Sequence, residues 1–290
     1  MTTTPRMPAA FIGHGSPMNT LEVNRFTNAW RELGESLPRP RAILCISAHW
    51  LIQGSAVTAM PQPRVIHDFF GFPPELFAFD YPAPGAPDIA QEIADAVQPS
   101  FVALDQDSWG LDHGTWSVLA HVFPRADIPV LQLSLHGGES AQYHLDLGAR
   151  LAPLRDRGIF IVASGNVVHN LRRLDWNLAD RAYDWGERFD AHVKQAMTSD
   201  PRQLATAHTH PDYRPSVPTP EHFLPLLYIA GIAAASGDAV TAFAEGGTMG
   251  AITMTSYLVG GRQQAARQPG SSEQAPLPDP RDVPPEQTNL

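Results

Sequence analysis

Short apolar runs alternate with helix-like segments along most of the chain. The run "AILCISA" (42–48) is apolar at nearly every position and rich in β-forming residues, which is typical of a strand buried on both faces. The same criteria predict strands at 9–13, 42–48, 55–60, 101–105, 129–135, 158–165, 239–246 and 251–260, and helices at 21–37, 88–97, 115–123, 140–156, 177–199 and 221–236. This alternation predicts an α/β fold, with a single domain around a mainly parallel or mixed central sheet flanked by helices.

The composition of the chain changes near its end. Residues 262–290 contain many prolines and glutamines and no aromatic residue, so they have little apolar surface to bury. We therefore expect one folded domain over residues 1–261, followed by a disordered tail over 262–290.

Charge and targeting signals narrow the classes of partner. The net charge is −10, with 20 Lys and Arg against 30 Asp and Glu, so nucleic acids and anionic membranes are not expected as partners. Cys45 is the single cysteine, which excludes an intrachain disulfide and a zinc site built on cysteines. The N-terminal segment lacks the apolar region of a signal peptide, and no apolar run is long enough to span a bilayer. A cytoplasmic location is expected.

The twelve histidines are not scattered evenly over the predicted elements. In α/β folds, ligands bind beyond the carboxyl ends of the strands. His14, His49, His136 and His169 each stand at or shortly after the end of a predicted strand. Because histidine is the commonest metal ligand and a frequent acid or base, we expect a site at this edge of the sheet.

His14 and His49 each allow two interpretations. His14 lies in "GHGSP" and is either a metal ligand, with the flanking glycines letting metal and substrate come close, or a turn residue bonded to nearby backbone. His49 in "SAHW" is either a ligand or a buried histidine that donates to a carbonyl. Adjacent strand ends would bring the two imidazoles to one edge, which favours the metal site for the pair.

Three further histidines have both functional and structural explanations. His113 either contacts an anionic substrate beside a helix start or stands idle while Asp112 caps that helix. His169 in "ASGNVVHN" is a ligand, an acid or base, or a residue at a helix start. Glu221 and His222 are neighbours, so a carboxylate or an imidazole could come from this position.

The segment 67–85 is unusually aromatic and rich in proline. Six aromatic residues lie between Phe69 and Tyr81, and they either wall a pocket for a flat substrate or cover the core. Arg64, His208 and His210 are candidates for contacts with polar groups of a substrate.

Six stretches of the chain together resemble one family of enzymes. They are "FIGHGSPMN", "ILCISAHW", "HDFFGFPPELFAFDYPAPG", "LDHGTWSVL", "ASGNVVHNL" and "AEGGTMGAITMTSYLVG". In order and spacing, over about residues 8–260, they resemble the bacterial 4,5-DOPA extradiol dioxygenases. These are class III extradiol ring-cleavage dioxygenases and relatives of the protocatechuate 4,5-dioxygenase β subunit.

The resemblance implies a non-haem Fe(II) enzyme that opens a catechol ring next to the diol with O₂. His14 and His49 match the two N-terminal metal histidines of the family, and His113 matches the histidine on the substrate side. His169 matches the acid or base and is also a candidate ligand. Distant relatives use a glutamate as the remaining ligand, whereas DOPA-type members imply His222, so the choice among His222, Glu221 and His169 stays open.

The ligand set also bears on the metal. An all-histidine site leaves the metal with charge +2, which favours an anionic catecholate and also suits zinc, an ion without redox chemistry. We therefore expect Fe(II) in the active form and zinc in the purified protein. Two other functions remain open: a zinc-dependent hydrolase with His169 as base, and a non-enzymatic metal-binding member of the same fold. The physiological catechol, the ring bond that is cleaved and the oligomeric state also stay open.

Overall fold

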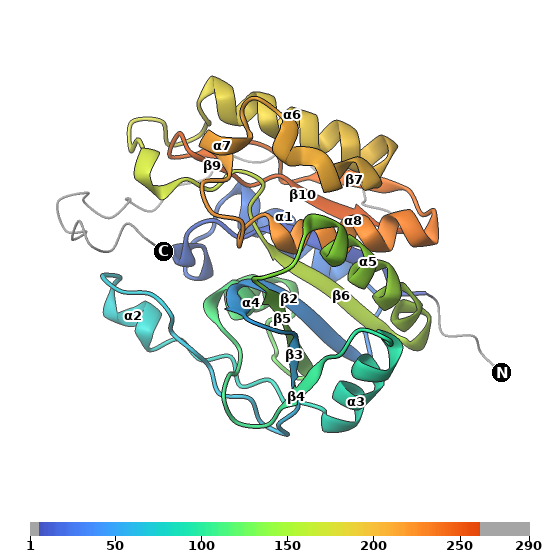
Figure 1. The fold of residues 1–290 in the computed structure, drawn as a ribbon. Coiled ribbons are helices and arrows are strands. Elements are labelled where there is room, and N and C mark those ends of the chain that lie inside the picture. Colours follow the sequence, from blue (N-terminus) through green and yellow to red (C-terminus); the bar gives the residue numbers. More distant parts are fainter. Residues whose placement is uncertain (1–5, 262–290) are drawn as a thin grey trace.

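A computed structural model describes residues 6–261 of the chain (Figure 1). In these residues the strands are β1 (Ala9–Gly13), β2 (Ala42–Ile52), β3 (Ala56–Thr58), β4 (Ala103–Asp105), β5 (Val130–His136), β6 (Ile159–Gly165), β7 (Val240–Phe243), β8 (Gly247–Thr248), β9 (Ile252–Thr253) and β10 (Ser256–Val259). The α-helices are α1 (Arg25–Ser36), α2 (Pro74–Phe77), α3 (Pro87–Ala96), α4 (His113–Val122), α5 (Ala141–Leu151), α6 (Asp184–Ser199), α7 (Tyr213–Ser216) and α8 (Leu224–Ser236). The 3₁₀ helices are η1 (Pro17–Thr20), η2 (Ala152–Arg157), η3 (Leu171–Arg173) and η4 (Pro201–Thr209).

Eight of these strands form one mixed sheet in the order β4-β3-β5-β2-β6-β1-β10-β7. Its centre is parallel, because β2 pairs in parallel with β5 and β6, and β6 pairs in parallel with β1. The edges differ: β10 runs antiparallel to β1 and β7, and β3 runs antiparallel to β5. The single α/β domain around a mixed central sheet is therefore confirmed.

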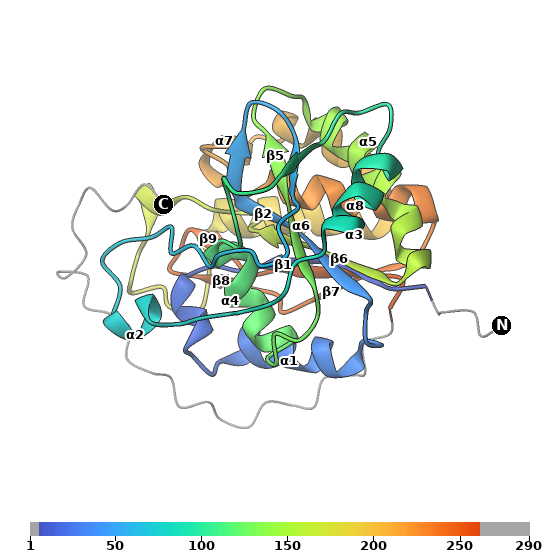
Figure 2. The same cartoon turned by 90° about the horizontal axis from the view of Figure 1, so that it is seen from below.

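Both faces of the central strands are covered by helices, which explains why these strands are apolar throughout. In β6, Ile159, Ile161 and Ala163 pack into one hydrophobic cluster, while Phe160 and Val162 pack into another. Figure 2 shows α1 and α4 below the sheet and α3, α5 and α8 above it. Successive side chains of a strand point to opposite faces, so each strand contributes to both clusters.

Several predicted boundaries were wrong, and local hydrogen bonds explain one of them. The helix predicted at 21–37 begins at Arg25, because the Asn24 side chain accepts from the N–H groups of Phe26 and Thr27 and closes a capping box. The run predicted as one strand at 251–260 forms two strands, β9 and β10. The helix predicted from 177 begins only at Asp184.

No helix within residues 6–261 combines the length and apolarity that crossing a membrane requires. Helix α8 is apolar, with its first ten residues buried, but it has only 13 residues. The predicted tail 262–290 lies outside the described residues, and the domain boundary at 261 stays a prediction.

Candidate active site

The carboxyl ends of β1, β2 and β6 meet at one edge of the sheet because these strands run parallel. The register aligns Ser164 of β6 with Ile12 of β1 and with Ser47 of β2. The His14 N–H extends the β1–β6 pairing by one step and donates to the Gly165 carbonyl at 3.1 Å. The backbone thereby fixes the position from which the His14 side chain leaves the sheet.

Five histidines gather at this edge, although they are far apart in the sequence. His14 follows β1, His49 lies near the end of β2, His113 opens α4, His169 follows β6, and His222 precedes α8. The distances between ring centres are 5.2 Å for His14–His49, 5.3 Å for His14–His222, 5.1 Å for His49–His222, 5.8 Å for His14–His113, 3.9 Å for His49–His113 and 3.5 Å for His169–His222. The structure thus brings together the five histidines that the family resemblance assigns to the site.

His136 is the strand-end histidine that does not take part in these contacts. Its ring lies 5.7 Å from that of Tyr143, and its Nδ1 accepts from the Gly138 N–H at 3.2 Å. It ends β5, which lies on the far side of β2 from β6 and β1 in the sheet. A place at a strand end was therefore a useful criterion, but it was not sufficient.

Hydrogen bonds fix both the ring and the backbone of His14. Its Nδ1 lies 2.9 Å from Ser164 Oγ, and its carbonyl accepts from the Asn19 side-chain amide at 2.9 Å. The next N–H, of Gly15, donates to Asn166 Oδ1 at 3.2 Å. With Nδ1 engaged, Nε2 is the nitrogen that faces the cluster, and it lies 3.3 Å from His49 Nε2.

The two glycines around His14 lie against Met254. Gly15 has φ of +61°, which favours glycine, and a Cβ built there would lie 2.6 Å from Met254 Sδ. A Cβ on Gly13 would lie 2.7 Å from the Met254 backbone. These glycines make room for Met254 between β9 and β10, and their predicted role toward a metal or substrate stays a prediction.

Asp68 was not among the residues that we predicted for the site, yet it contacts two of the histidines. Its Oδ1 lies 2.9 Å from His113 Nδ1 and accepts from the His113 backbone N–H at 3.0 Å, while Oδ2 lies 3.2 Å from His49 Nδ1. Burial by itself would raise the pKa of this carboxyl, but the interactions with His113 and His49 hold the pKa below its ordinary value. In the sequence Asp68 appears only in the dipeptide "HD", which by itself does not indicate a contact with either histidine.

Asp112 caps α4, and the neighbouring His113 lies in the histidine group. The Asp112 side chain accepts from the Thr115 N–H at 3.2 Å and so caps α4. Ser47 Oγ and Gln132 also donate to this carboxyl, whose pKa is raised to about 6 by burial and by the nearby Asp68. His113 nevertheless lies in the histidine group, so the cap and the site are built from adjacent residues.

Glu221 contacts His222 and occupies a position beside its ring. Glu221 Oε1 lies 3.3 Å from His222 Nδ1 and also accepts from Thr219 Oγ1 at 2.7 Å. This contact leaves Nε2 of His222 as the ring nitrogen that can bind a further group. The neighbours Glu221 and His222 are therefore a contacting pair in the fold.

The ring of His169 stacks on that of His222, with 9° between the planes and 3.5 Å between the centres. A metal ion binds in the plane of an imidazole, along the nitrogen lone pair, and two nearly parallel planes this far apart share no such point. In this arrangement the two ring planes do not meet at a common metal position, and the metal role predicted for His169 stays a prediction. Burial lowers the pKa of His169 to about 4, so the ring is neutral near pH 7.

The histidine group fits a metal ion by two separate measures. Ligand nitrogens of His14, His49 and His113 all lie within 4.8 Å of one another. The ring centres of His14, His49 and His222 form a nearly equilateral triangle of 5.1–5.3 Å. Three imidazoles on one ion at ~2.1 Å with tetrahedral angles would have centres about 5.2 Å apart. The two measures agree on His14 and His49 and differ on the third residue.

The charge state of the group also suits a metal. Burial, followed by the neighbouring rings, lowers the pKa of His14 and of His222 well below the ordinary value. The pKa of His49 is lowered too, mainly by burial. Histidine must be neutral to bind a metal, and these buried rings are neutral at physiological pH.

The aromatic segment lies beside the site and also packs on the core. Phe69 contacts the His113 ring with 5.5 Å between the centres and lies among Phe72, Phe77 and Trp116. Its ring is buried, as expected of a core residue, and it flanks His113, as expected of a pocket wall. The two proposed roles for this segment are therefore compatible.

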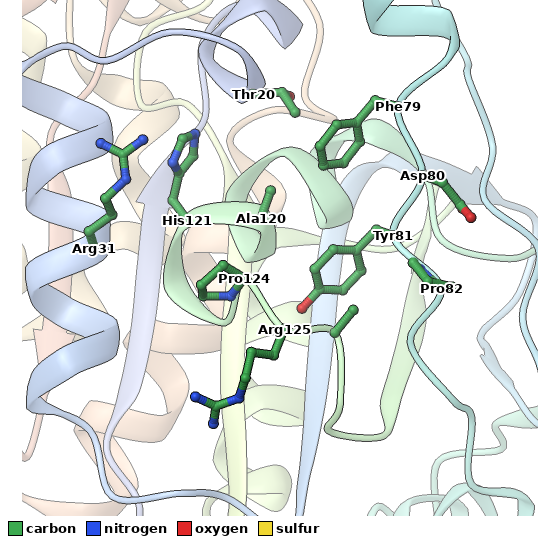
Figure 3. A pocket seen from close by; sticks show the side chains of 11 residues that line it. Thr20, Arg31, Phe79, Asp80, Tyr81, Pro82, Ala120, His121, Pro124 and Arg125 are labelled. Atoms are coloured by element: carbon green, nitrogen blue, oxygen red, sulfur yellow. The ribbon is translucent and has the colours of Figure 1, made fainter.

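Two of the candidates for substrate contacts interact with other groups. Arg64 donates to the Ser108 carbonyl at 2.6 Å. His210 packs against His192 of α6, with 4.6 Å between ring centres. A separate surface groove of about 560 Å³ lies between α1, α4 and the segment around Tyr81, with His121 on one side and Phe79 on the other (Figure 3). None of the five clustered histidines lines this groove.

Comparison with known proteins identifies the family. Residues 9–259 match the family described as the catalytic LigB subunit of aromatic ring-opening dioxygenase. The chain belongs to this family and is an extradiol aromatic ring-opening dioxygenase. The match favours the dioxygenase over the zinc hydrolase and the non-enzymatic protein that the sequence had left open.

The relatives match most of the chain. A protein of Escherichia coli K12 named 4,5-DOPA dioxygenase extradiol is 47% identical, over 88% of this chain and 95% of that protein. A protein of Beta vulgaris with the same name is 36% identical, over 79% of this chain and 88% of the relative. The crystal structure of an uncharacterized Escherichia coli K12 protein has a TM-score of 0.78 and 43% identity, covering 88% of this chain and 100% of that one.

Proposed function

We propose that the protein is a non-haem Fe(II) enzyme that opens the ring of a DOPA-like catechol next to its diol with O₂. The triangle of His14, His49 and His222 is the observation that carries the proposal, because its dimensions are those of three imidazoles around one ion. The names of the relatives support a DOPA-like substrate. The family match over 9–259 supports a single catalytic domain within residues 1–261.

His14, His49 and His222 are the proposed metal ligands. His14 and His49 present Nε2 atoms 3.3 Å apart, a spacing that suits two ligands of one ion at ~2.1 Å. His222 is preferred to Glu221 because the carboxylate contacts the Nδ1 of this ring and so supports it from outside. His222 is preferred to His169 because the His222 ring completes the triangle with His14 and His49, whereas the His169 ring is stacked on His222.

His169 is the proposed acid and base. Its ring stacks on His222 at the edge of the site and is neutral near pH 7, so it can take a proton from a catechol hydroxyl. The same imidazole can return the proton as the ring opens. His113 is the proposed substrate-side histidine, because Asp68 engages its Nδ1 and leaves Nε2 free toward a catechol oxygen.

Iron is the proposed metal of the active enzyme, and zinc is the metal expected in the protein as purified. Fe(II) in this site would supply the electron transfer between catechol and O₂ that the ring opening requires. Three neutral histidines add no negative charge, so the site keeps a +2 charge that attracts an anionic catecholate. Zinc fits the same ligands but has no redox chemistry, and we expect no turnover with zinc alone. We propose a cytoplasmic location for the enzyme.

The test is O₂ uptake with a panel of catechols after anaerobic loading of the protein with Fe(II). We expect a yellow ring-opened product from DOPA or a related catechol, and none with zinc alone. In His169→Ala we expect activity to fall about 10²–10⁴-fold while iron is retained, as for loss of an acid–base group. Full activity in this variant, or turnover with zinc alone, contradicts the mechanism.

The third ligand is tested by two matched variants. His222→Ala should lose metal affinity more than the roughly 100-fold typical of outer partners. His113→Ala should retain the metal and lose catalytic efficiency instead. The reverse result would make His113 the ligand, in line with the grouping of its nitrogen with those of His14 and His49.

A further inference from the structure

One carboxylate connects two histidines with different proposed roles. Asp68 Oδ1 accepts from the His113 backbone N–H at 3.0 Å and lies 2.9 Å from His113 Nδ1. Its Oδ2 lies 3.2 Å from His49 Nδ1. The Asp68 side chain is only 17% exposed. The two oxygens therefore face two different rings, whose centres are 3.9 Å apart.

We propose that Asp68 is a positioning residue that sets the tautomers of His49 and His113 together. The inference rests on the proposed metal site. An ionised carboxylate only accepts hydrogen bonds, so His113 Nδ1 carries its proton toward Asp68. The negative charge of the same carboxylate, 3.2 Å from His49 Nδ1, favours a proton on that nitrogen as well. Each Nε2 then has its lone pair free. His49 presents that lone pair to the metal, and His113 presents it to the substrate.

The two oxygens of Asp68 are not equivalent, and this determines what an amide would do in their place. The oxygen on the His113 side accepts two donors, one of which is a backbone N–H that cannot change its role. In Asp68→Asn the amide oxygen must stay on that side. The amide nitrogen then faces His49 Nδ1 at the position of Oδ2, and its partly positive N–H groups disfavour a proton on that nitrogen, which shifts the proton of this ring to Nε2. The nearly isosteric variant therefore blocks the nitrogen that faces the metal.

This asymmetry predicts an unusual order of variants. A residue that only fills space tolerates Asn better than Ala, because Asn keeps the shape. If Asp68 sets the tautomer, Asn is worse for metal binding than Ala, since Ala leaves His49 free to choose either tautomer. We expect zinc affinity to fall about 100-fold in Asp68→Asn and about 10-fold in Asp68→Ala, the range found for outer partners of metal-bound histidines.

The experiment measures zinc affinity by competition with a chromophoric chelator and the His49 tautomer by ¹⁵N NMR of the metal-free protein. Asp105→Asn is the matched control, because Asp105 is a similarly buried carboxylate that accepts from the N–H groups of Ser108 and Trp109. We expect the control to bind zinc like the wild type. The His49 proton should be on Nδ1 in the wild type and on Nε2 in Asp68→Asn.

The outcomes separate this inference from the function on which it rests. If the wild type and His49→Ala bind zinc equally, the proposed metal site is wrong. If the wild type binds through His49 but Asp68→Asn binds as tightly, or if Ala is worse than Asn, Asp68 does not set the tautomer. An unchanged His49 tautomer in Asp68→Asn overturns the inference without any use of metal.

Discussion

Polar side chains are buried at both ends of the central parallel strands, but their polar groups point to different partners at the two ends. At the amino ends of β1 and β6, Arg155 is 1% exposed, donates to the Met7 carbonyl at 2.7 Å and pairs with Asp238 at 2.9 Å. At the carboxyl ends, His14 and His49 use one nitrogen for a neighbouring side chain and turn the other toward the cluster.

The difference distinguishes a structural polar cluster from a functional one. Arg155 donates to the carbonyls of Met7, just before β1, and of Val259, at the end of β10. Its hydrogen bonds therefore connect these two neighbouring strands of the sheet. The clustered histidines are buried at a cost in desolvation, which lowers the pKa of His14, and they retain free lone pairs. Both ends bury polar groups. Arg155 points its donors at backbone and side-chain acceptors of the fold, whereas each histidine turns one ring nitrogen toward the other histidines.

The largest expected effect is the loss of metal affinity when a histidine at the carboxyl ends of the strands is replaced. In His14→Ala, metal affinity should fall more than the roughly 100-fold known for outer partners, and ring opening should drop to background. The free energy of unfolding of the metal-free protein should fall by about 1–2 kcal/mol, because the contacts of the His14 ring with Ser164 Oγ and His49 Nε2 are lost. Metal titration and chemical denaturation measure the two quantities.

A histidine outside the cluster provides the control for that variant. His192 lies on α6 beside His210, and His192→Ala should leave both metal affinity and activity unchanged. The comparison fails if His14→Ala retains the metal but unfolds easily, because His14 would then be a structural residue like Arg155.

A change at the amino end should have the opposite signature. Arg155→Met removes a buried charge and leaves Asp238 with only the longer pairing to Arg6 at 3.9 Å, so stability should fall by about 3 kcal/mol. Metal affinity measured below the unfolding transition should stay at the wild-type value. A loss of metal affinity without a loss of stability would show that the two ends are coupled.

The smallest effect concerns a buried histidine outside both ends. His144 lies 3.1 Å from the Tyr228 hydroxyl, and burial, with a smaller effect of His136, lowers its pKa to about 4. Between pH 6.5 and 4 the unfolded chain binds this proton and the folded protein does not, so stability falls as the pH falls. The loss should reach about 2–3 kcal/mol by pH 4.

His144→Gln removes this titration while keeping a polar side chain. Denaturation curves of the metal-free protein at pH 7 and pH 4.5 should differ less in this variant than in the wild type. Equal acid sensitivity in both proteins would assign the loss to the histidines of the active site instead.

The sequence predicted much of this molecule because its central strands carry strong local signals. Strands buried on both faces read as apolar runs, and β1 and β6 lie where such runs were found. The rule that ligands bind at strand ends then brought His14, His49 and His169 into view. It also included His136, because the periodicity does not reveal which strands neighbour one another in the sheet.

What only the tertiary structure decided is how these histidines are held. The chain determined by itself the α/β class, the position of the site at the strand ends and the residue types that could bind a metal. Asp68 contacts His49 and His113 through pairings over 19 and 45 residues of chain, which no local pattern encodes. The glycines around His14 were visible in the sequence, but their neighbour Met254 comes from the far end of the chain. Such contacts depend on how separate segments pack, whereas the strands depend on local hydrophobic pattern.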